Sequence, residues 1–205
     1  AMDAATRAQK EWAALTGSAR GRILYEVGRL VRANAEAIAE MECRSAGRPI
    51  RDMRGEAVRV AEMFEYYAGW CDKLHGEVIP VPSSHLNYTR REPIGVVGQI
   101  VPWNFPFLMA AWKLAPALAA GDCVVIKSSS STPLSLNVLA DLISDLLPAG
   151  VLNVITGKGS KSGQYILDHP GFSKLAFTGS TEVGRGVAKA AADRLIPATL
   201  ELGGK

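Results

Sequence analysis

The sequence contains few of the residues that hold metals and disulfides. Among its 205 residues there are three cysteines and three histidines. Cys43, Cys71 and Cys123 show no CxxC spacing, and an odd number of cysteines argues against a disulfide framework. Because there is no HExxH motif either, we expect no metal site. Reduced thiols are typical of a cytoplasmic protein, so the cytoplasm is the expected location.

A strong net charge is also lacking. The formal net charge is +3, and the basic clusters at 51–54 and 90–91 contain no interleaved aromatic residues, so no nucleic-acid partner is expected. The longest apolar stretch, 105–120, is interrupted by Lys113 and Pro116 and is too short to span a bilayer, so no membrane partner is expected. An average composition, 48% hydrophobic and 21% charged, indicates a globular protein with a buried core.

Residues 1–75 show the apolar spacing of helices and are predicted to form a helical lead-in that packs on the next domain. One helix is expected to begin after Asn34, which can cap it, and to end at Gly47. Another begins near Asp52 and carries an aromatic stripe, which we interpret as a packing face in preference to a ligand site. The stripe consists of Val60, Met63, Phe64, Tyr67 and Trp70.

The pattern changes at Gly76. Residues 76–93 are predicted to form an antiparallel hairpin from strands at 77–81 and 85–91. Because an isolated two-stranded hairpin is barely stable in water, we expect it to pack on another subunit or on a segment of its own chain outside this sequence. Packing of the hairpin on another subunit predicts a homo-oligomer, either a dimer or a tetramer.

Residues 94–205 alternate apolar strands with helices, which is typical of a parallel sheet covered on both faces. The predicted fold class is α/β, a Rossmann-like parallel sheet with helices on both faces, and a nucleotide is expected at its carboxyl edge. The expected strands are 96–101, 123–127, 152–156, 174–178 and 198–202, and the expected helices are 107–120, 134–147, 162–168 and 181–194.

Two glycine-bearing loops join strands to helices. Gly157-Lys-Gly-Ser-Lys-Ser-Gly163 is one residue longer than the GxGxxG fingerprint and is a weak signal alone. The second loop, 177–184, puts Gly179 and Ser180 at the start of a helix, where free N–H groups favour a phosphate. An ordinary turn with Ser180 or Thr181 as N-cap explains the second loop equally well.

Pro102-Trp-Asn-Phe-Pro106 directly follows the first strand of the sheet. Its two prolines restrict the loop, so it can aim the Asn104 amide at a developing negative charge. The alternative is that Asn104 satisfies backbone groups in a tight turn, and composition alone favours this alternative.

Four motifs together resemble the aldehyde dehydrogenase superfamily in order and spacing. They are Pro102-Trp-Asn-Phe-Pro106, Val125-Ile-Lys127 with Thr132-Pro133-Leu134, Phe177-Thr-Gly-Ser-Thr-Glu-Val-Gly184 and Leu200-Glu-Leu-Gly-Gly-Lys205. The helical lead-in is similar too, so the resemblance covers essentially the whole chain. It covers less than half of a typical family member, and we expect the cofactor-binding amino-terminal part of an enzyme whose catalytic-cysteine domain is absent.

The resemblance implies the chemistry. In this family a cysteine thiolate attacks the aldehyde, hydride passes to NAD or NADP, and water cleaves the thioester. Asn104 matches the residue that donates to the oxyanion, and Glu201 matches the general base. Substrate-channel positions are matched by Phe105, Met109 and Trp112. Without the family, Glu201 would be interpreted as an ordinary charge at a strand end.

Lys127 matches the residue that binds the adenosine ribose hydroxyls. The other positions implied to bind the cofactor are Val101, Pro102, Trp103, Asn104, Ser128, Ser130, Gly159, Gly163, Phe177, Gly179, Ser180, Val183, Gly184, Leu202 and Gly203. The family often has Glu at the Ser130 position, where a carboxylate bonds the 2′-hydroxyl and repels a 2′-phosphate. Serine removes that repulsion, so NADP is expected to be tolerated or preferred.

No cysteine matches the family's nucleophile, which lies a few tens of residues beyond the Glu201 position. Cys43, Cys71 and Cys123 fall in helices or at a strand start, and buried thiols of that kind are inert. The chain alone is therefore expected to be inactive, and its last residues fall inside a motif, which favours truncation. The alternative is a natural, non-catalytic module for nucleotide binding or oligomerisation. A related acyl-phosphate reductase fits the motifs poorly.

Overall fold

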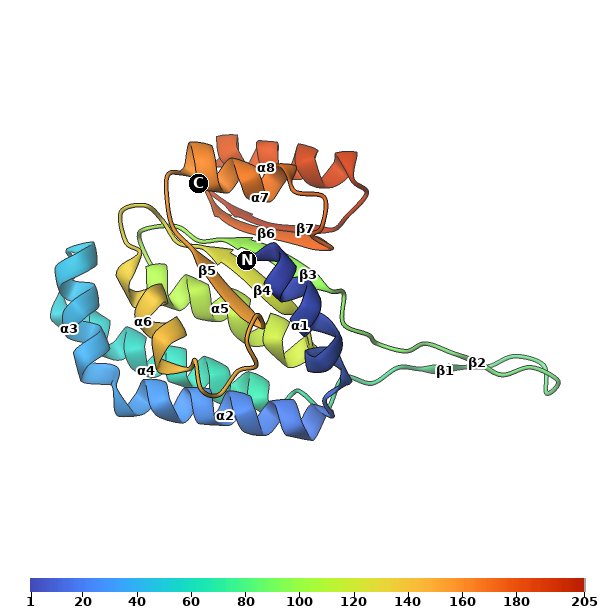
Figure 1. Ribbon diagram of the computed structural model, residues 1–205. Helices are drawn as coiled ribbons and strands as arrows, with labels where there is room; N and C mark the ends of the chain where they lie inside the picture. The colour runs from blue at the N-terminus through green and yellow to red at the C-terminus, as the bar shows by residue number, and fades with distance from the viewer. Residues whose placement is uncertain (205) are drawn as a thin grey trace.

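The computed structural model describes residues 1–204. The part of the chain up to Ala68 consists of helices and short connections, as predicted (Figure 1). The four helices are α1 (Met2–Ala14), α2 (Gly17–Ala33), α3 (Ala35–Ala46) and α4 (Ile50–Ala68). Thr16 caps α2, because its side chain accepts a hydrogen bond from the Ala19 N–H. Gly47 ends α3 in the left-handed conformation, with φ of 69°, as the sequence predicts.

Two details of the lead-in differ from prediction. Asn34 occupies the N-cap position of α3 but makes no capping bond, because its amide donates backwards to the Leu30 carbonyl at 2.8 Å. The aromatic stripe is a packing face at Val60 and Phe64, which are fully buried. Trp70 is 41% exposed because α4 ends at Ala68, so the packing prediction is wrong for that residue.

The predicted hairpin is present but its paired part is short. Strand β1 (Val78–Ile79) pairs antiparallel with β2 (Asn87–Tyr88), and the hairpin projects away from the rest of the molecule (Figure 1). Residues 72–92 are exposed throughout. The longer strands that we predicted do not form, since Pro80 and Pro82 have no N–H to donate to a ladder.

The remaining strands form the predicted parallel sheet, in the order β5-β4-β3-β6-β7. They are β3 (Val96–Ile100), β4 (Cys123–Lys127), β5 (Leu152–Ile155), β6 (Lys174–Gly179) and β7 (Ala198–Leu202). The connecting elements are α5 (Pro106–Ala120), α6 (Leu134–Leu142), the π-helical turn η1 (Gly159–Gly163), α7 (Gln164–Asp168) and α8 (Thr181–Asp193).

Two predicted helix boundaries are wrong. The helix predicted at 134–147 ends at Leu142, and turns follow it, with the Leu146 N–H bonded to the Ile143 carbonyl at 3.0 Å. Pro148 disfavours helical backbone at Leu147, but this does not account for the earlier end of the helix at Leu142. The helix predicted at 162–168 is preceded by η1, which starts at Gly159.

Helices cover the two faces of the sheet unequally. Figure 1 shows α5 on one side of the sheet and α7 and α8 on the other. Helix α1 lies across the amino end of β4, where the Gln9 side chain accepts a bond from the Cys123 N–H at 2.7 Å. Strands β3 and β4 are buried, but four of the five residues of β7 are exposed. The predicted parallel sheet with helices on both faces is therefore confirmed, and β7 is its exposed edge strand.

None of the helices in residues 1–204 is both long enough and apolar enough to cross a membrane.

Candidate active site

The strand order creates a switch point at the carboxyl edge of the sheet. From β3 the chain continues to β4 and β5 on one side, and then returns to β6 and β7 on the other side of β3. Connections that diverge from neighbouring strands leave a crevice outside their carboxyl ends, and ligands of open α/β sheets bind there. The loop after β3 and the end of β6 border this crevice.

A cavity of about 550 Å³ occupies this position. We refer to it as the Asn104–Glu201 cavity, because the structure brings these two side chains to its lining from segments almost a hundred residues apart. Its lining residues are Pro102, Trp103, Asn104, Phe105, Leu108, Met109, Trp112, Thr178, Gly179, Ser180, Glu201, Leu202 and Gly203. Eight of the predicted site residues are therefore neighbours around one space.

Asn104 is free to act on a ligand. Its side chain is exposed, and it makes no hydrogen bond with any residue in the range 1–204. The structural alternative, in which its amide satisfies backbone groups of a tight turn, is therefore wrong. Its neighbours Trp103 and Phe105 are also exposed, by 64% and 39%.

Glu201 is positioned by the pairing of the two last strands. The register sets Glu201 of β7 directly beside Thr178 of β6. The Thr178 hydroxyl donates to the Glu201 carboxylate at 3.3 Å, which holds the acid at the cavity while leaving it exposed. An exposed carboxylate with one neutral donor remains available to accept a proton.

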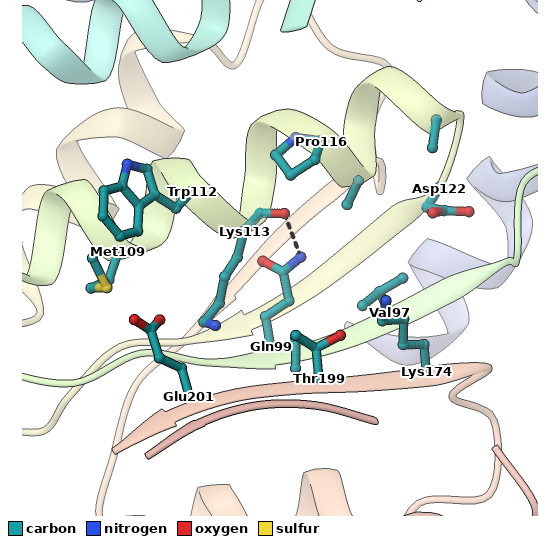
Figure 2. Close-up of a pocket in the computed structure, with 13 residues that line it drawn as sticks. Val97, Gln99, Met109, Trp112, Lys113, Pro116, Asp122, Lys174, Thr199 and Glu201 are labelled. Atoms are coloured by element: carbon teal, nitrogen blue, oxygen red, sulfur yellow. Dashed lines mark hydrogen bonds between the residues drawn. The ribbon is translucent and has the colours of Figure 1, made fainter. Parts of the chain in front are cut away.

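A second cavity of about 430 Å³ adjoins the first and shares Met109, Trp112 and Glu201 with it. Figure 2 shows the Lys113 amine and the Glu201 carboxylate pointing into this space. Burial lowers the pKa of Lys113, and the charge of Glu201 opposes that decrease. We missed Lys113 as a site residue, although a single charge inside an apolar helix was a signal that could have identified it.

Gln99 also lines the second cavity. Its amide N–H donates to the Lys113 carbonyl at 2.8 Å (Figure 2), which fixes the side chain between β3 and α5. Its Oε1 atom is buried without a partner among residues 1–204. No sequence motif indicated this residue, because its contact joins a strand to a helix that only the fold brings together.

A separate group of predicted residues lies at the end of β4. The Lys127 amine is buried and donates to the Ser128 carbonyl at 2.7 Å, and burial lowers the pKa of this amine. The Val101 N–H donates to the Lys127 carbonyl at 3.1 Å, so the ends of β3 and β4 are joined. Ser130 is exposed. Gly163 lies against the Lys127 side chain, since a Cβ on Gly163 would stand 3.9 Å from that side chain.

Two glycines near the start of α8 lie close to neighbouring side chains. A Cβ on Gly184 would stand 2.3 Å from Leu202, and a Cβ on Gly179 would stand 2.5 Å from the Phe177 ring. The Ser180 side chain accepts a bond from the Val183 N–H at 3.4 Å, so the N-cap interpretation of this serine is confirmed. The N–H groups of the first two helical residues have no intrahelical partner and stay available to an anion.

The remaining predicted residues are dispersed. Val101, Lys127, Ser128, Ser130, Gly159, Gly163, Phe177, Val183 and Gly184 lie along the carboxyl edge outside the Asn104–Glu201 cavity. Phe177 is buried in the sheet, whereas Val183 is half-exposed on α8. The structure thus places the predicted catalytic pair and part of the predicted cofactor positions around one cavity, and distributes the other cofactor positions along the carboxyl edge.

None of the cysteines in residues 1–204 lines either cavity. Cys123 is fully buried, and burial raises the pKa of its thiol to about 12. Burial also raises the pKa of Cys71. A thiol that ionises so late is a poor nucleophile at neutral pH, as we expected for these positions.

Comparison with known proteins gives one consistent result. The model of the aldehyde dehydrogenase family matches residues 1–205. A long-chain-aldehyde dehydrogenase of an Acinetobacter species is 46% identical over 206 residues, which are 100% of this chain and 41% of that protein.

Solved structures agree with this match. PnpE of Pseudomonas in complex with nicotinamide adenine dinucleotide is 46% identical, with a TM-score of 0.96 over 99% of this chain and 42% of that one. An NAD+ complex of an aldehyde dehydrogenase from Bacillus cereus is 40% identical, with a TM-score of 0.97 over 100% of this chain and 42% of that one. The chain thus spans about two fifths of the length of the relatives it matches.

Proposed function

The chain belongs to the aldehyde dehydrogenase family, and from this premise we propose that it forms the cofactor-binding part of an NAD(P)-dependent aldehyde dehydrogenase. The parent enzyme oxidises an aldehyde to a carboxylic acid through a cysteine thioester. The observation that carries the proposal is the meeting of a free asparagine amide and an accessible carboxylate in one cavity at the switch point of the sheet. The apolar side chains of α5 that line the same cavity suit the hydrocarbon part of an aldehyde.

In this proposal Asn104 stabilises charge. When a thiolate adds to the aldehyde carbon, the carbon–oxygen double bond opens and the oxygen becomes an anion. The Asn104 N–H donates to that anion, and a donor held in advance gives more stabilisation to the anion than to the neutral carbonyl. The thiol itself comes from a part of the parent enzyme outside residues 1–205.

Glu201 acts as the general base in this proposal. It accepts a proton from the attacking thiol or from the water that later cleaves the thioester, and its hydrogen bond from Thr178 keeps it directed at the cavity. The water oxygen bonds to the thioester carbon, the thiolate leaves, and the carboxylic acid is released. A nicotinamide dinucleotide, when bound, supplies the hydride acceptor for the oxidation.

The carboxyl edge fits such a dinucleotide. The buried Ser128 hydroxyl has no partner among residues 1–204, which suits a further polar ligand atom. Lys127 would donate to ribose hydroxyls, and the free N–H groups at the start of α8 would face a phosphate. Because Ser130 is exposed and uncharged, the site does not repel a 2′-phosphate, and we propose that NADP is accepted together with NAD.

The test is kinetic and uses the full-length parent enzyme. Asn104→Ala should lower kcat by about 10²–10³-fold, as loss of one oxyanion donor does, while the Kd for NAD stays within about twofold, a difference of under about 0.5 kcal/mol. NADH formation from an aliphatic aldehyde measures the first quantity, and quenching of intrinsic fluorescence by NAD measures the second. Asn137→Ala on α6, outside the cavity, is the matched control and should leave both unchanged.

Two results would contradict the proposal. One is a full-length protein that binds NAD but forms no NADH from any aldehyde, which would favour a non-catalytic module. The other is an Asn104→Ala variant that retains the original kcat.

A further inference from the structure

The helix that follows the Asn104 loop begins without a cap of its own. The N-cap position of α5 is Phe105, whose side chain cannot accept a hydrogen bond, and the first helical residue is Pro106. The first intrahelical bond is from the Met109 N–H to the Phe105 carbonyl at 2.9 Å. The N–H groups of Phe107 and Leu108 therefore need partners from elsewhere in the molecule.

Helix α4 supplies one of these partners. Glu56 is only 3% exposed, and its carboxylate accepts a hydrogen bond from the Leu108 N–H at 3.3 Å. The two residues are 52 positions apart in the sequence. A carboxylate at a helix start also interacts favourably with the helix dipole, so Glu56 caps α5 from a neighbouring helix.

Arg48 completes the arrangement from the loop between α3 and α4. Its guanidinium donates to the second oxygen of Glu56, and its central carbon lies 4.0 Å from the centroid of the Phe105 ring. The guanidinium thus pairs the buried carboxylate and stacks on the residue next to Asn104. A buried charge is stable only when it is paired and hydrogen-bonded in this way.

Together Glu56 and Arg48 hold the segment that directly follows Asn104. Arg48 contacts Phe105, one residue after Asn104, and Glu56 bonds Leu108, four residues after it. The preceding part of the loop has little support, since Trp103 and Asn104 are exposed. Holding the start of α5 in place therefore helps to orient the side-chain amide of Asn104.

We propose that Glu56, paired with Arg48, is a positioning residue that holds the Asn104 amide in its oxyanion-binding geometry. This inference rests on the proposed function of Asn104. Neither side chain lines the Asn104–Glu201 cavity, so neither residue touches the reacting atoms, and each acts through the backbone of the loop.

The experiment is a double-mutant cycle in the full-length enzyme. Glu56→Ala should lower kcat by about 10-fold to 100-fold, the cost of a small misplacement of a catalytic group, with the Kd for NAD unchanged. In an Asn104→Ala background the same substitution should cost less than about twofold, because the group that it positions is already gone. Glu56→Gln, which keeps an oxygen for the Leu108 N–H, should recover most of the activity.

A role in stability alone predicts a different result. In that case Glu56→Ala would lower the activity by the same factor in both backgrounds, and this equality, or an undiminished kcat in Glu56→Ala, would overturn the proposal. Glu65 lies on the same helix α4 as Glu56 and forms an ion pair with Arg32 of α2. Glu65→Gln breaks this pair and is the matched control, expected to leave kcat unchanged.

A second variant covers the case in which Glu56→Ala does not fold. Arg48→Met releases Phe105 while leaving the Glu56 acceptor, and it should lower kcat by about 5-fold to 20-fold through the same kind of misplacement, again only when Asn104 is present. If Asn104→Ala alone leaves kcat unchanged, the proposed function fails and this inference fails with it. If Asn104→Ala is inactive and the cycle shows no coupling, only the positioning role is wrong.

Discussion

At the scale of single residues, two polar side chains at the same sheet edge have different roles. The Ser180 hydroxyl caps α8 by accepting a hydrogen bond from the Val183 N–H. The Asn104 amide, in contrast, has no hydrogen-bond partner within residues 1–204. Both residue types favour turns and caps, so the sequence left a structural explanation open for each. Only the tertiary structure separates a side chain that is used by the fold from one that remains free.

The proposed tolerance of NADP is also a prediction at this scale, and it depends on Ser130. Ser130→Glu in the full-length enzyme should weaken NADP binding at least about tenfold, or about 1.4 kcal/mol, because a carboxylate repels the 2′-phosphate. Binding of NAD should change by less than about twofold, since its 2′-hydroxyl can donate to the carboxylate. Titration of both cofactors by fluorescence measures the two affinities.

The matched control introduces the same charge elsewhere. Ser18→Glu, at an exposed position in the first turn of α2, should leave both affinities unchanged. A wild-type enzyme that already binds NAD more than about tenfold better than NADP would refute the proposed tolerance of NADP.

At the scale of elements, the start of α5 is where three helices meet. Besides Glu56, the buried carboxylate of Glu42 on α3 lies close to the Phe107 N–H. Its two oxygens have no hydrogen-bond partner of normal geometry among residues 1–204. Burial raises its pKa, the Ser135 hydroxyl lowers it, Glu56 raises it further, and Arg48 opposes that rise.

A raised pKa has a consequence for stability. The folded protein holds the Glu42 proton more tightly than the unfolded chain does, so this residue favours folding at low pH and disfavours it as the pH rises through the folded-state pKa. Glu42→Gln should therefore raise the free energy of unfolding by about 1 kcal/mol at about pH 8 and change it little at about pH 4. Urea midpoints of the full-length protein at the two pH values measure the difference.

Glu40→Gln replaces an exposed carboxylate on the same helix and should not alter the pH dependence. If Glu42→Gln instead destabilises the protein at about pH 8, the ionised carboxylate is used in the fold, with the Ser135 hydroxyl and the Phe107 N–H as its donors.

At the scale of the whole molecule, two regions of residues 1–204 carry exposed surface that an isolated domain would normally bury. One is strand β7 with the adjoining cavities, and the other is the hairpin. Val78 and Tyr88, which pair across the hairpin, are 76% and 61% exposed, and Leu86 is 76% exposed. Apolar side chains on a projecting hairpin are typical of a subunit contact.

We therefore expect the hairpin to hold a homo-oligomer together. Changing both Val78 and Tyr88 to Asp should convert the full-length enzyme into a smaller species, because two charges cannot be buried unpaired in an interface. Light scattering after size-exclusion chromatography gives the mass. Leu195→Asp changes a residue that is 94% exposed between α8 and β7 and is the control; an unaltered mass in the hairpin variant would show that the contact lies elsewhere.

The sequence by itself determined the elements and their order. Apolar periodicity and the glycine and proline positions predicted the helices, the hairpin and the five parallel strands, and the error at β1 arose where Pro80 and Pro82 interrupt an apolar run. Motif order pointed to Asn104, Lys127 and Glu201. These signals are local, because each depends on residues that are neighbours in the chain.

Only the tertiary structure decided which side chains meet. The bond from Thr178 to Glu201, the Lys113 amine beside that acid, and the cap that Glu56 gives to Leu108 all join residues from different elements. The strand order also put β3 next to β6 and so created the cavity. Such contacts depend on how elements pack and on strand register, and one sequence does not encode these distances in any local pattern.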